Sequence, residues 1–130
     1  MSVSGRSYLL DTHVLIWLSS DLRRIPPKVL EVLQDLETEL WASTVSFWEL
    51  AIKQNLGKFD AAIRFDEMEK THRIRELTIH SKYTEEIRRL PLLHGDPFDR
   101  MLVAQAMAEG MTLVTADRRL VGYPVGILLV

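Results

Sequence analysis

The sequence predicts an α/β protein with a mainly parallel central β-sheet flanked by helices, an α/β/α sandwich. Short apolar clusters of strand length alternate with helix-length segments, which is the pattern of parallel strands joined by right-handed helical crossovers. No internal repeat, low-complexity tract or Gly/Ser linker interrupts this alternation. The 130 residues, 47% of them hydrophobic and 26% charged, suit one core. We therefore expect a single domain over residues 1–130.

The strands are expected at five apolar clusters. They are short and flanked by polar or turn-forming residues, as buried parallel strands usually are. The clusters span residues 8–10, 40–42, 77–79, 111–114 and 125–129.

Six segments between these clusters are expected to be helical. Prolines near the first turn favour the start of the second, and Gly57 and Gly110 are suitable stops for the third and the last. The segments span residues 12–19, 26–36, 45–56, 65–75, 81–90 and 97–109. Residues 55–65 have mixed character and are expected to form a loop or a short hairpin.

Composition excludes several classes of protein. The absence of cysteine excludes a disulfide scaffold, a zinc–thiolate site and a cysteine nucleophile, and it fits an intracellular location. The longest apolar run, residues 14–18, is far shorter than the ~20 residues of a membrane span, and no secretory signal is visible in residues 1–7. A net charge of −2 argues against a protein that merely coats nucleic acid. It leaves open an enzyme that meets phosphates through bound metal ions.

Acidic residues recur where strands end or helices begin. Asp11 directly follows the first strand, Asp96 and Asp99 open the last helix, and Asp117 lies just beyond the fourth strand. Each has an ordinary structural interpretation. Asp11, Asp96 and Asp117 suit helix or loop caps, and Asp99 suits the positive end of a helix dipole.

Glu49 stands among apolar residues in the third helical segment. It could close a capping box with Ser46. Alternatively, Ser43 or Thr44 begins the helix earlier and leaves Glu49 in the second turn, where no backbone amide is free. The second interpretation favours a functional role, because a carboxylate in an apolar setting is costly unless it is paired or bound to a ligand.

Taken together, these acids predict a metal site. Asp11, Asp99 and Asp117 fall at one edge of the expected sheet, and Glu49 lies just beyond another strand. Converging carboxylates repel one another unless cations neutralise them. Oxygen-rich clusters without cysteine suit Mg²⁺ or Mn²⁺, and such ions activate water for attack on phosphodiesters.

Four separated motifs contain the acids and their neighbours. They are LLDTHVLIW at 9–17, STVSFWELAIK at 43–53, HGDPFDRMLVAQA at 94–106 and LVTAD at 113–117. In this order, over nearly the whole chain, they resemble the motifs of PIN-domain proteins, and more narrowly those of the VapC-type ribonuclease toxins of bacterial toxin–antitoxin pairs.

The resemblance implies a cytoplasmic, metal-dependent endoribonuclease with a PIN-like domain. It places the catalytic and metal-binding acids at Asp11, Glu49, Asp99 and Asp117, with Mg²⁺ or Mn²⁺ as cofactor. It further implies hydrolysis of RNA, of the transfer or ribosomal class, to 5′-phosphate and 3′-hydroxyl ends, and a small antitoxin as partner.

Further residues are candidates for supporting roles. Asp96 is a helix cap or an outer ligand, Thr115 matches a hydroxyl position that the family uses to arrange the site, and Ser46 and Arg100 lie near the acids in sequence. His13 and His94 are interpreted as a packed helix residue and a loop residue in preference to substrate contacts. Candidates for phosphate contacts, each also compatible with a solvated surface, are Lys53, Lys58, Arg64, Arg73, Arg75, Arg100, Arg118 and Arg119.

Three other functions fit the sequence less well. A phosphotransfer receiver domain normally has a lysine after a late strand, and residues 111–117 contain none. A haloacid-dehalogenase-like phosphatase has a second aspartate where His13 stands. A non-catalytic PIN scaffold that binds protein or RNA is disfavoured by the intact quartet.

Two interfaces are expected from apolar residues. The stretch from residue 52 to residue 65 is a candidate groove for the antitoxin. Trp41, Phe59, Leu92 and Leu93 supply apolar surface for a homodimer.

Overall fold

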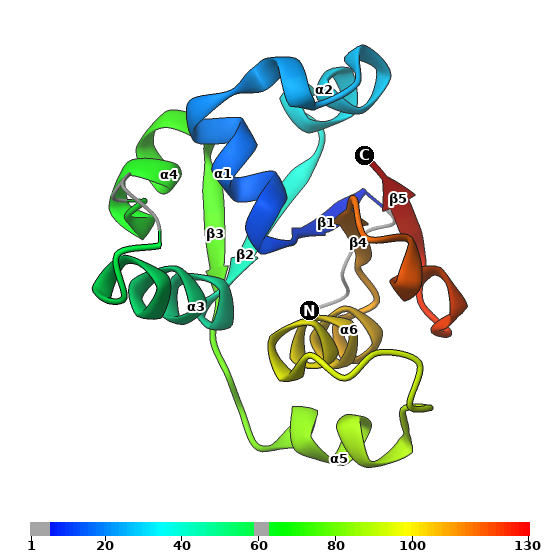
Figure 1. Cartoon of the computed structure of the whole chain (residues 1–130). Helices are drawn as coiled ribbons and strands as arrows, with labels where there is room; N and C mark the ends of the chain where they lie inside the picture. Colours follow the sequence, from blue (N-terminus) through cyan, green and yellow to red (C-terminus); the bar gives the residue numbers. More distant parts are fainter. Residues whose placement is uncertain (1–5, 59–62) are drawn as a thin grey trace.

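A five-stranded parallel sheet forms the centre of the computed structural model, which describes residues 6–58 and 63–130 (Figure 1). The strand order is β3-β2-β1-β4-β5, and all four neighbouring pairs are parallel. The strands are β1 (Ser7–Leu10), β2 (Glu39–Ser43), β3 (Ile74–Leu77), β4 (Thr112–Thr115) and β5 (Ile127–Leu129). The predicted α/β class with a parallel sheet is confirmed.

All six expected helices are present. They are α1 (Thr12–Ser20), α2 (Pro27–Gln34), α3 (Thr44–Asn55), α4 (Phe65–His72), α5 (Lys82–Arg89) and α6 (Pro97–Glu109). Two 3₁₀ turns, η1 (Leu22–Arg24) and η2 (Arg118–Gly122), were not anticipated. Each follows an aspartate: Asp21 precedes η1, and Asp117 precedes η2.

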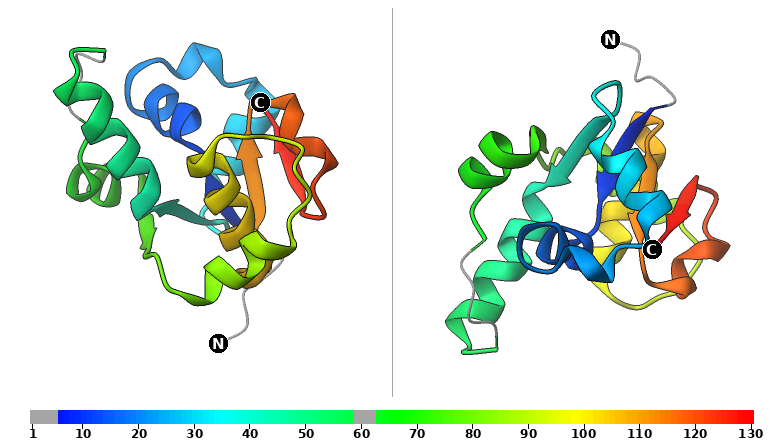
Figure 2. Two further views of the ribbon diagram at one scale, coloured as in Figure 1. Left: turned by 60° about the horizontal axis from the view of Figure 1, so that its bottom comes forward. Right: turned by 90° about the horizontal axis from the view of Figure 1, so that it is seen from above.

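Helices cover both faces of the sheet (Figure 2). Consecutive residues of a strand point to opposite faces, so Leu9 and Leu113 pack in one core cluster and Leu10 and Val114 in the other. The first cluster receives α5 and α6, and the second receives α1, α2 and α4. Burial on both faces explains why the strands read as continuous apolar runs.

The third strand lies three residues earlier than expected, at 74–77 in place of 77–79. Arg73 adopts a left-handed conformation (φ 56°) that ends α4 at His72, short of the expected residue 75. Ile74 is then fully buried and pairs with Leu40 of β2. Ile79, which the apolar cluster placed inside the strand, is 42% exposed.

The start of α3 decides between the two interpretations of Glu49. Ser43 caps the helix, because its Oγ accepts a hydrogen bond from the Val45 N–H at 3.1 Å. The capping box between Ser46 and Glu49 is therefore wrong. Glu49 lies in the second turn of α3 and is buried all the same.

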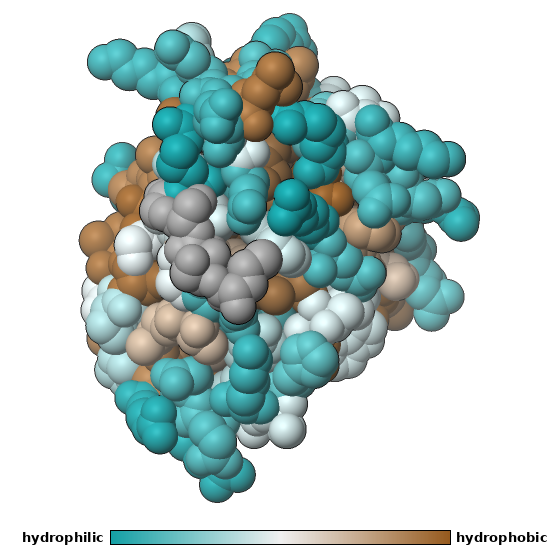
Figure 3. All heavy atoms as spheres, turned by 180° about the vertical axis from the view of Figure 1, so that it is seen from behind, coloured by the Kyte–Doolittle hydropathy of each residue, from teal (hydrophilic) through white to brown (hydrophobic). Residues whose placement is uncertain are grey.

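The structure exposes less of Trp41 than a dimer interface through this residue requires. Trp41 is only partly exposed; it packs against the core, and the Arg75 guanidinium lies over its ring at 5.6 Å. Leu92 and Leu93 are exposed, whereas Phe59 lies outside the described residues. The face opposite to that of Figure 1 mixes apolar and polar side chains (Figure 3). Among the helices of the described residues, none is long and apolar enough to cross a membrane.

The topology creates a natural binding position between β1 and β4. From β1 the chain proceeds outward to β2 and β3 on one side, whereas β4 and β5 lie on the other. In open parallel sheets, ligands bind at the carboxyl ends of the strands where the order reverses in this way. Asp11 and Thr115 stand at that point.

Candidate functional site

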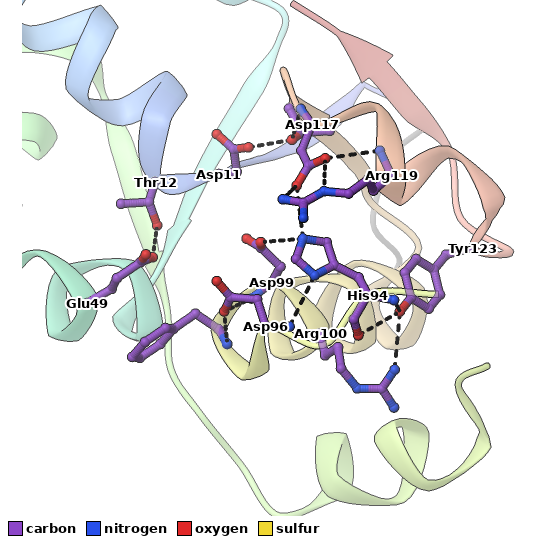
Figure 4. Close-up of polar contacts among 12 residues, drawn as sticks. Asp11, Thr12, Glu49, His94, Asp96, Asp99, Arg100, Asp117, Arg119 and Tyr123 are labelled. Carbon is purple, nitrogen blue, oxygen red and sulfur yellow. Dashed lines mark hydrogen bonds and ion pairs between the residues drawn. The ribbon is translucent and has the colours of Figure 1, made fainter. Parts of the chain in front are cut away.

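A pocket rich in charged residues lies at the carboxyl ends of β1 and β4 (Figure 4). Five carboxylates and three cations contribute to its wall. The lining residues are Asp11, Thr12, His13, Trp17, Arg24, Glu49, Lys53, Asp96, Asp99, Ala116, Asp117 and Arg119. All four predicted catalytic acids are among them.

Asp11 performs a structural task and faces the pocket as well. One carboxylate oxygen caps α1 by accepting from the Val14 N–H at 2.9 Å, and the other accepts a hydrogen bond from the Thr115 hydroxyl. Burial of the carboxyl raises the pKa of Asp11, and the bond from Thr115 opposes that shift. Thr115 Oγ1 also accepts from the Asp117 N–H at 3.0 Å, so it links two of the predicted acids.

Glu49 reaches the pocket from α3, where it is held by two side chains. Thr12 Oγ1 donates to Glu49 Oε1 at 2.7 Å, and Lys53 Nζ lies 3.0 Å from Oε2. Ser46 is fully buried, and its hydroxyl lies 3.1 Å from that of Thr12. Ser46 is therefore linked to Glu49 through Thr12, which makes its contribution to the site indirect.

The start of α6 brings two acids into the pocket. Asp96 is the N-cap, accepting from the Phe98 N–H at 2.8 Å and the Asp99 N–H at 3.3 Å. Asp99 follows in the first turn. Its pKa is raised to about 7, first by burial and then by repulsion from Asp96, with smaller contributions from Asp11 and Glu49.

His94 bridges two of the acids. Its Nε2 lies 2.9 Å from Asp117 Oδ2 and 3.2 Å from Asp99 Oδ2. Its Nδ1 accepts a hydrogen bond from the Asp96 backbone N–H at 3.1 Å. Because Nδ1 acts as acceptor, the proton of the ring is assigned to Nε2. His94 is therefore a hydrogen-bond donor to the carboxylates.

Asp117 differs from Asp99 in having a permanent cation. Arg119 binds it through two nitrogens, with Nε 3.0 Å from Oδ1 and the terminal nitrogen 2.9 Å from Oδ2. These bonds, with those from the Arg119 N–H and His94, hold the pKa of Asp117 well below its ordinary range, and Asp117 raises that of Arg119 in turn. Asp117 also acts as a cap, because its side chain accepts from the Arg119 N–H at the start of η2.

Arg100 does not face the acids, contrary to the supporting role suggested by its position in the sequence. Its guanidinium donates to the carbonyl oxygens of Pro91 and Ile87 and to the Tyr123 hydroxyl. Tyr123 Oη in turn accepts from the His94 N–H at 3.0 Å. Arg100 therefore fixes the loop that carries His94.

One group of side chains beside the pocket comes close enough together to share a metal ion. In the described part of the chain, ligand atoms of His94, Asp99 and Asp117 come within 4.8 Å of one another. A ligating His94 Nε2 has to lose its proton, however, and Nδ1 then carries it against the Asp96 N–H. The carboxylates of Asp11, Glu49 and Asp99 line the pocket and offer the oxygen donors that Mg²⁺ and Mn²⁺ prefer, but within the described residues they do not form a group whose ligand atoms all lie within 4.8 Å of one another.

Sequence reasoning underrated His94 and did not single out Trp17 or Arg24. His94 precedes Asp96 by two residues, and this short spacing was a usable signal of a shared turn. Arg24 belongs to the unanticipated turn η1, so its approach to the pocket had no local signal.

Comparison with known proteins gives one family. The model of the PIN domain family matches residues 8–125. Ribonuclease VapC22 of Mycobacterium tuberculosis is 30% identical over 115 residues, which cover 86% of this chain and 88% of that protein.

Solved structures share the fold. VapBC2 from Rickettsia felis, bound to a DNA fragment from its promoter, superimposes with a TM-score of 0.70 at 19% identity over 95% of this chain and 98% of that one. DNA-bound VapBC from Salmonella typhimurium gives 0.62 at 17% identity, over 94% and 96%. VapBC-1 from nontypeable Haemophilus influenzae gives 0.60 at 17%, over 95% and 97%.

Proposed function

Because the chain belongs to the PIN domain family and, within it, to the VapC ribonucleases, we propose that it is a metal-dependent endoribonuclease and the toxin of a toxin–antitoxin pair. One observation carries the metal dependence. Carboxylates from β1, α3 and α6 line a single pocket at the switch point of the sheet, and the pKa of Asp99 rises to about 7 there because burial and neighbouring acids act together. A divalent cation removes that excess of negative charge.

Asp11, Glu49 and Asp99 are the residues that would hold the ion, and Asp117 completes the site. A bound Mg²⁺ or Mn²⁺ supplies an activated water and balances the charge that grows on the phosphate during hydrolysis. The chain keeps these carboxylates in place with fixed donors. Thr115 orients Asp11, Thr12 orients Glu49, and His94 and Arg119 orient Asp117.

RNA of the transfer or ribosomal class is the proposed substrate, and the cytoplasm the proposed location. A small antitoxin is the proposed partner, which the structural likeness to VapBC2 and VapBC supports. The candidate antitoxin groove begins at Ile52 and Leu56, which are 37% and 61% exposed, and it includes residues 59–62 outside the described part of the chain. A homodimer through Leu92 and Leu93 remains a proposal as well.

Cleavage of RNA by the purified protein tests the proposed activity. We expect metal-stripped protein to leave 5′-labelled transfer and ribosomal RNA intact, and Mn²⁺ or Mg²⁺ to restore cutting with 5′-phosphate and 3′-hydroxyl ends. Asp99→Asn is the matched control, because it keeps the shape of the side chain. A protein that cuts equally well in excess chelator overturns the metal dependence, and one that binds RNA without cutting it in any metal favours the non-catalytic scaffold.

Growth of a host that expresses the chain tests the role as toxin. We expect induction to arrest growth, and co-expression of the antitoxin or the Asp99→Asn substitution to relieve the arrest. Normal growth despite abundant folded protein contradicts the proposal. Sequencing of RNA ends after induction identifies the RNA that is cut.

A further inference from the structure

One wall of the acidic pocket is built from planar side chains. His13 and Trp17 are four residues apart on α1 and so share a face of the helix. Their ring centroids are 6.0 Å apart, and the Arg24 guanidinium lies 5.0 Å from the centroid of the Trp17 ring. All three side chains line the same pocket as Asp11 and Asp99.

Arg24 differs from the other cations of this pocket. Lys53 is paired with Glu49, and Arg119 with Asp117. Arg24 forms no ion pair within 4.0 Å with any acid of residues 6–58 and 63–130. Its guanidinium instead lies over the Trp17 ring. Its charge is thus available to an incoming anion.

A nucleotide of a single RNA strand matches this wall in both respects. Unpaired bases stack on aromatic rings and on arginine guanidinium planes, and the adjoining phosphate needs a cation. Without such a cation, the carboxylates of the pocket repel a phosphodiester approaching the reaction centre. In a duplex, by contrast, the bases already stack on one another and are not available.

We propose that His13, Trp17 and Arg24 form a nucleotide subsite beside the acidic pocket, where an unpaired RNA base stacks on the planar side chains and Arg24 contacts a neighbouring phosphate. The inference rests on the proposed ribonuclease function. It assigns the contacts with an unpaired base and its phosphate to named residues of this chain, without selection of a particular base.

Binding measurements separate the stacking contact from the charge contact. The probe is a fluorescein-labelled single-stranded RNA of mixed sequence, 12 nucleotides long, bound to protein in the Asp99→Asn background with Mn²⁺ so that cutting does not interfere. Trp17→Leu is expected to weaken binding by about 10- to 100-fold, and Trp17→Phe by much less, because a phenyl ring still stacks. An otherwise identical probe with abasic riboses should lose this difference.

Salt dependence reports the role of Arg24. Removing one phosphate contact by Arg24→Gln is expected to reduce the slope of log affinity against log salt concentration by about 0.7 for a single strand. Trp17→Leu should leave the slope unchanged. Trp48→Leu is the control, because Trp48 is exposed on α3 but does not line the pocket; it should bind the probe as the parent does.

Cleavage kinetics with the otherwise native chain complete the test. Trp17→Leu and Arg24→Gln are expected to raise KM for single-stranded RNA while kcat changes little, because they remove binding common to ground state and transition state. The subsite is overturned if the parent, Trp17→Leu and Arg24→Gln bind the probe equally well. It is also overturned if Trp48→Leu weakens binding as much as Trp17→Leu does, or if Trp17→Leu weakens binding of the abasic probe as much as that of the normal probe. If Trp17→Leu folds poorly, the salt dependence and KM of Arg24→Gln still test the subsite, because Arg24 is exposed and its substitution should not disturb folding.

The two possible failures are distinguishable. A native chain that cuts no RNA contradicts the proposed function, and the anisotropy of the labelled probe still measures the subsite. A chain that cuts single-stranded and duplex RNA equally well, with Trp17→Leu indistinguishable from the parent, keeps the function and overturns the subsite.

Discussion

The two halves of the acidic pocket hold carboxylates by different means. Asp11 and Glu49 emerge from the β1–α1 junction and from α3, and neutral hydroxyls of Thr115 and Thr12 donate to them. Asp117 is held by Arg119 and by His94, which also approaches Asp99. We name these the hydroxyl-held half (Asp11 and Glu49) and the histidine-linked half (Asp99 and Asp117).

The contrast shows that position at a strand end does not determine the charge state of an acid. Burial raises the pKa of Asp11 and of Asp99, whereas the nearby Arg119 lowers that of Asp117. Asp99 belongs to the histidine-linked half and yet behaves like buried Asp11, because burial and the repulsion from Asp96 outweigh the effect of His94 on its pKa. Substitutions in the two halves should therefore affect activity and stability differently.

The largest expected effect is loss of cutting after one carboxylate of either half is neutralised. Asp99→Asn and Glu49→Gln should each reduce metal-dependent cleavage by roughly 100-fold or more, since a ligand to the ion is replaced by a poorer one. Gel assays under saturating RNA measure this loss. Both variants should keep the circular dichroism spectrum of the parent, which shows that the loss of cleavage is not caused by unfolding.

Stability without metal should distinguish the same two variants. Asp99→Asn removes like-charge repulsion, so its apo melting temperature should stay level or rise. Glu49→Gln loses the ion pair with Lys53 and should lose about 0.5 kcal/mol. An early-melting Asp99→Asn that still cuts RNA contradicts its assignment as a ligand.

His94 should contribute next in size. His94→Leu removes the donor to Asp117 and is expected to weaken Mn²⁺ binding or activity by roughly 10- to 100-fold, the usual effect of losing a residue that orients a ligand. His94→Gln retains an N–H and should recover part of the loss. Calorimetric titration with Mn²⁺ measures the affinity, and the contrast fails if Gln and Leu behave alike.

Loss of the two threonine hydroxyls compares the stability contributions of the two contacts in the hydroxyl-held half. Thr115→Val leaves Asp11 Oδ2 without its donor and the Asp117 N–H without its acceptor, so we expect a cost of about 1–3 kcal/mol. Thr12→Val leaves Glu49 its Lys53 partner and should cost about 1 kcal/mol. Urea unfolding without metal gives both values, and a larger cost in Thr12→Val reverses the expected order.

The pH dependence of stability isolates Asp99. Its folded pKa of about 7 lies above the ordinary value of 3.8, so between these values the folded chain binds more protons and its stability falls as pH rises. We expect the free energy of unfolding of the metal-free protein to fall by about 1–2 kcal/mol between pH 5 and pH 8 through this group. This is less than the full pKa shift implies, because solvent reaches the carboxyl and screens its charge. Burial also raises the pKa of Asp11, which acts in the same direction, and lowers the pKa of His72, which acts in the opposite direction.

The difference between the parent and Asp99→Asn removes the contribution of His72. The low pKa of Asp117 matters only under more acidic conditions, because its stabilising contribution is lost as pH falls below about 4. Urea midpoints at pH 5 and pH 8 supply the comparison. Identical pH slopes in the two proteins contradict the assignment to Asp99.

The smallest expected effect belongs to Asp96. Asp96→Ala removes the cap of α6 and should cost about 1 kcal/mol, partly offset by the lost repulsion with Asp99. The cost should be the same with and without Mn²⁺, as thermal melts can show. A cost that appears only with Mn²⁺ identifies Asp96 as a ligand in place of a cap.

Much of the fold could be predicted from local sequence. Apolar runs located four of the five strands closely, and caps at Ser43 and Asp96 located the starts of α3 and α6. The third strand was misplaced because apolarity alone does not reveal a left-handed Arg73 that ends α4 early. The two 3₁₀ turns were missed because such short elements lack a periodic signal.

The acids of the pocket could be predicted because strand ends in a parallel sheet share an edge, which depends only on the order of elements. Asp11, Asp99 and Asp117 required no more than that rule and the recurring motifs. Glu49 does not follow a strand directly, so its prediction also depended on the free-energy cost of burying a carboxylate among apolar residues.

The partners of those acids were decided only by the tertiary structure. Which donor meets which carboxylate depends on loop paths and side-chain directions: Arg100 turns toward Pro91 and Tyr123 and away from the acids, while His94 turns inward. Local sequence determines an element's type through backbone preferences and periodic burial. Long-range hydrogen bonds, which set the pKa values and charge balance of this pocket, form only when distant segments pack together.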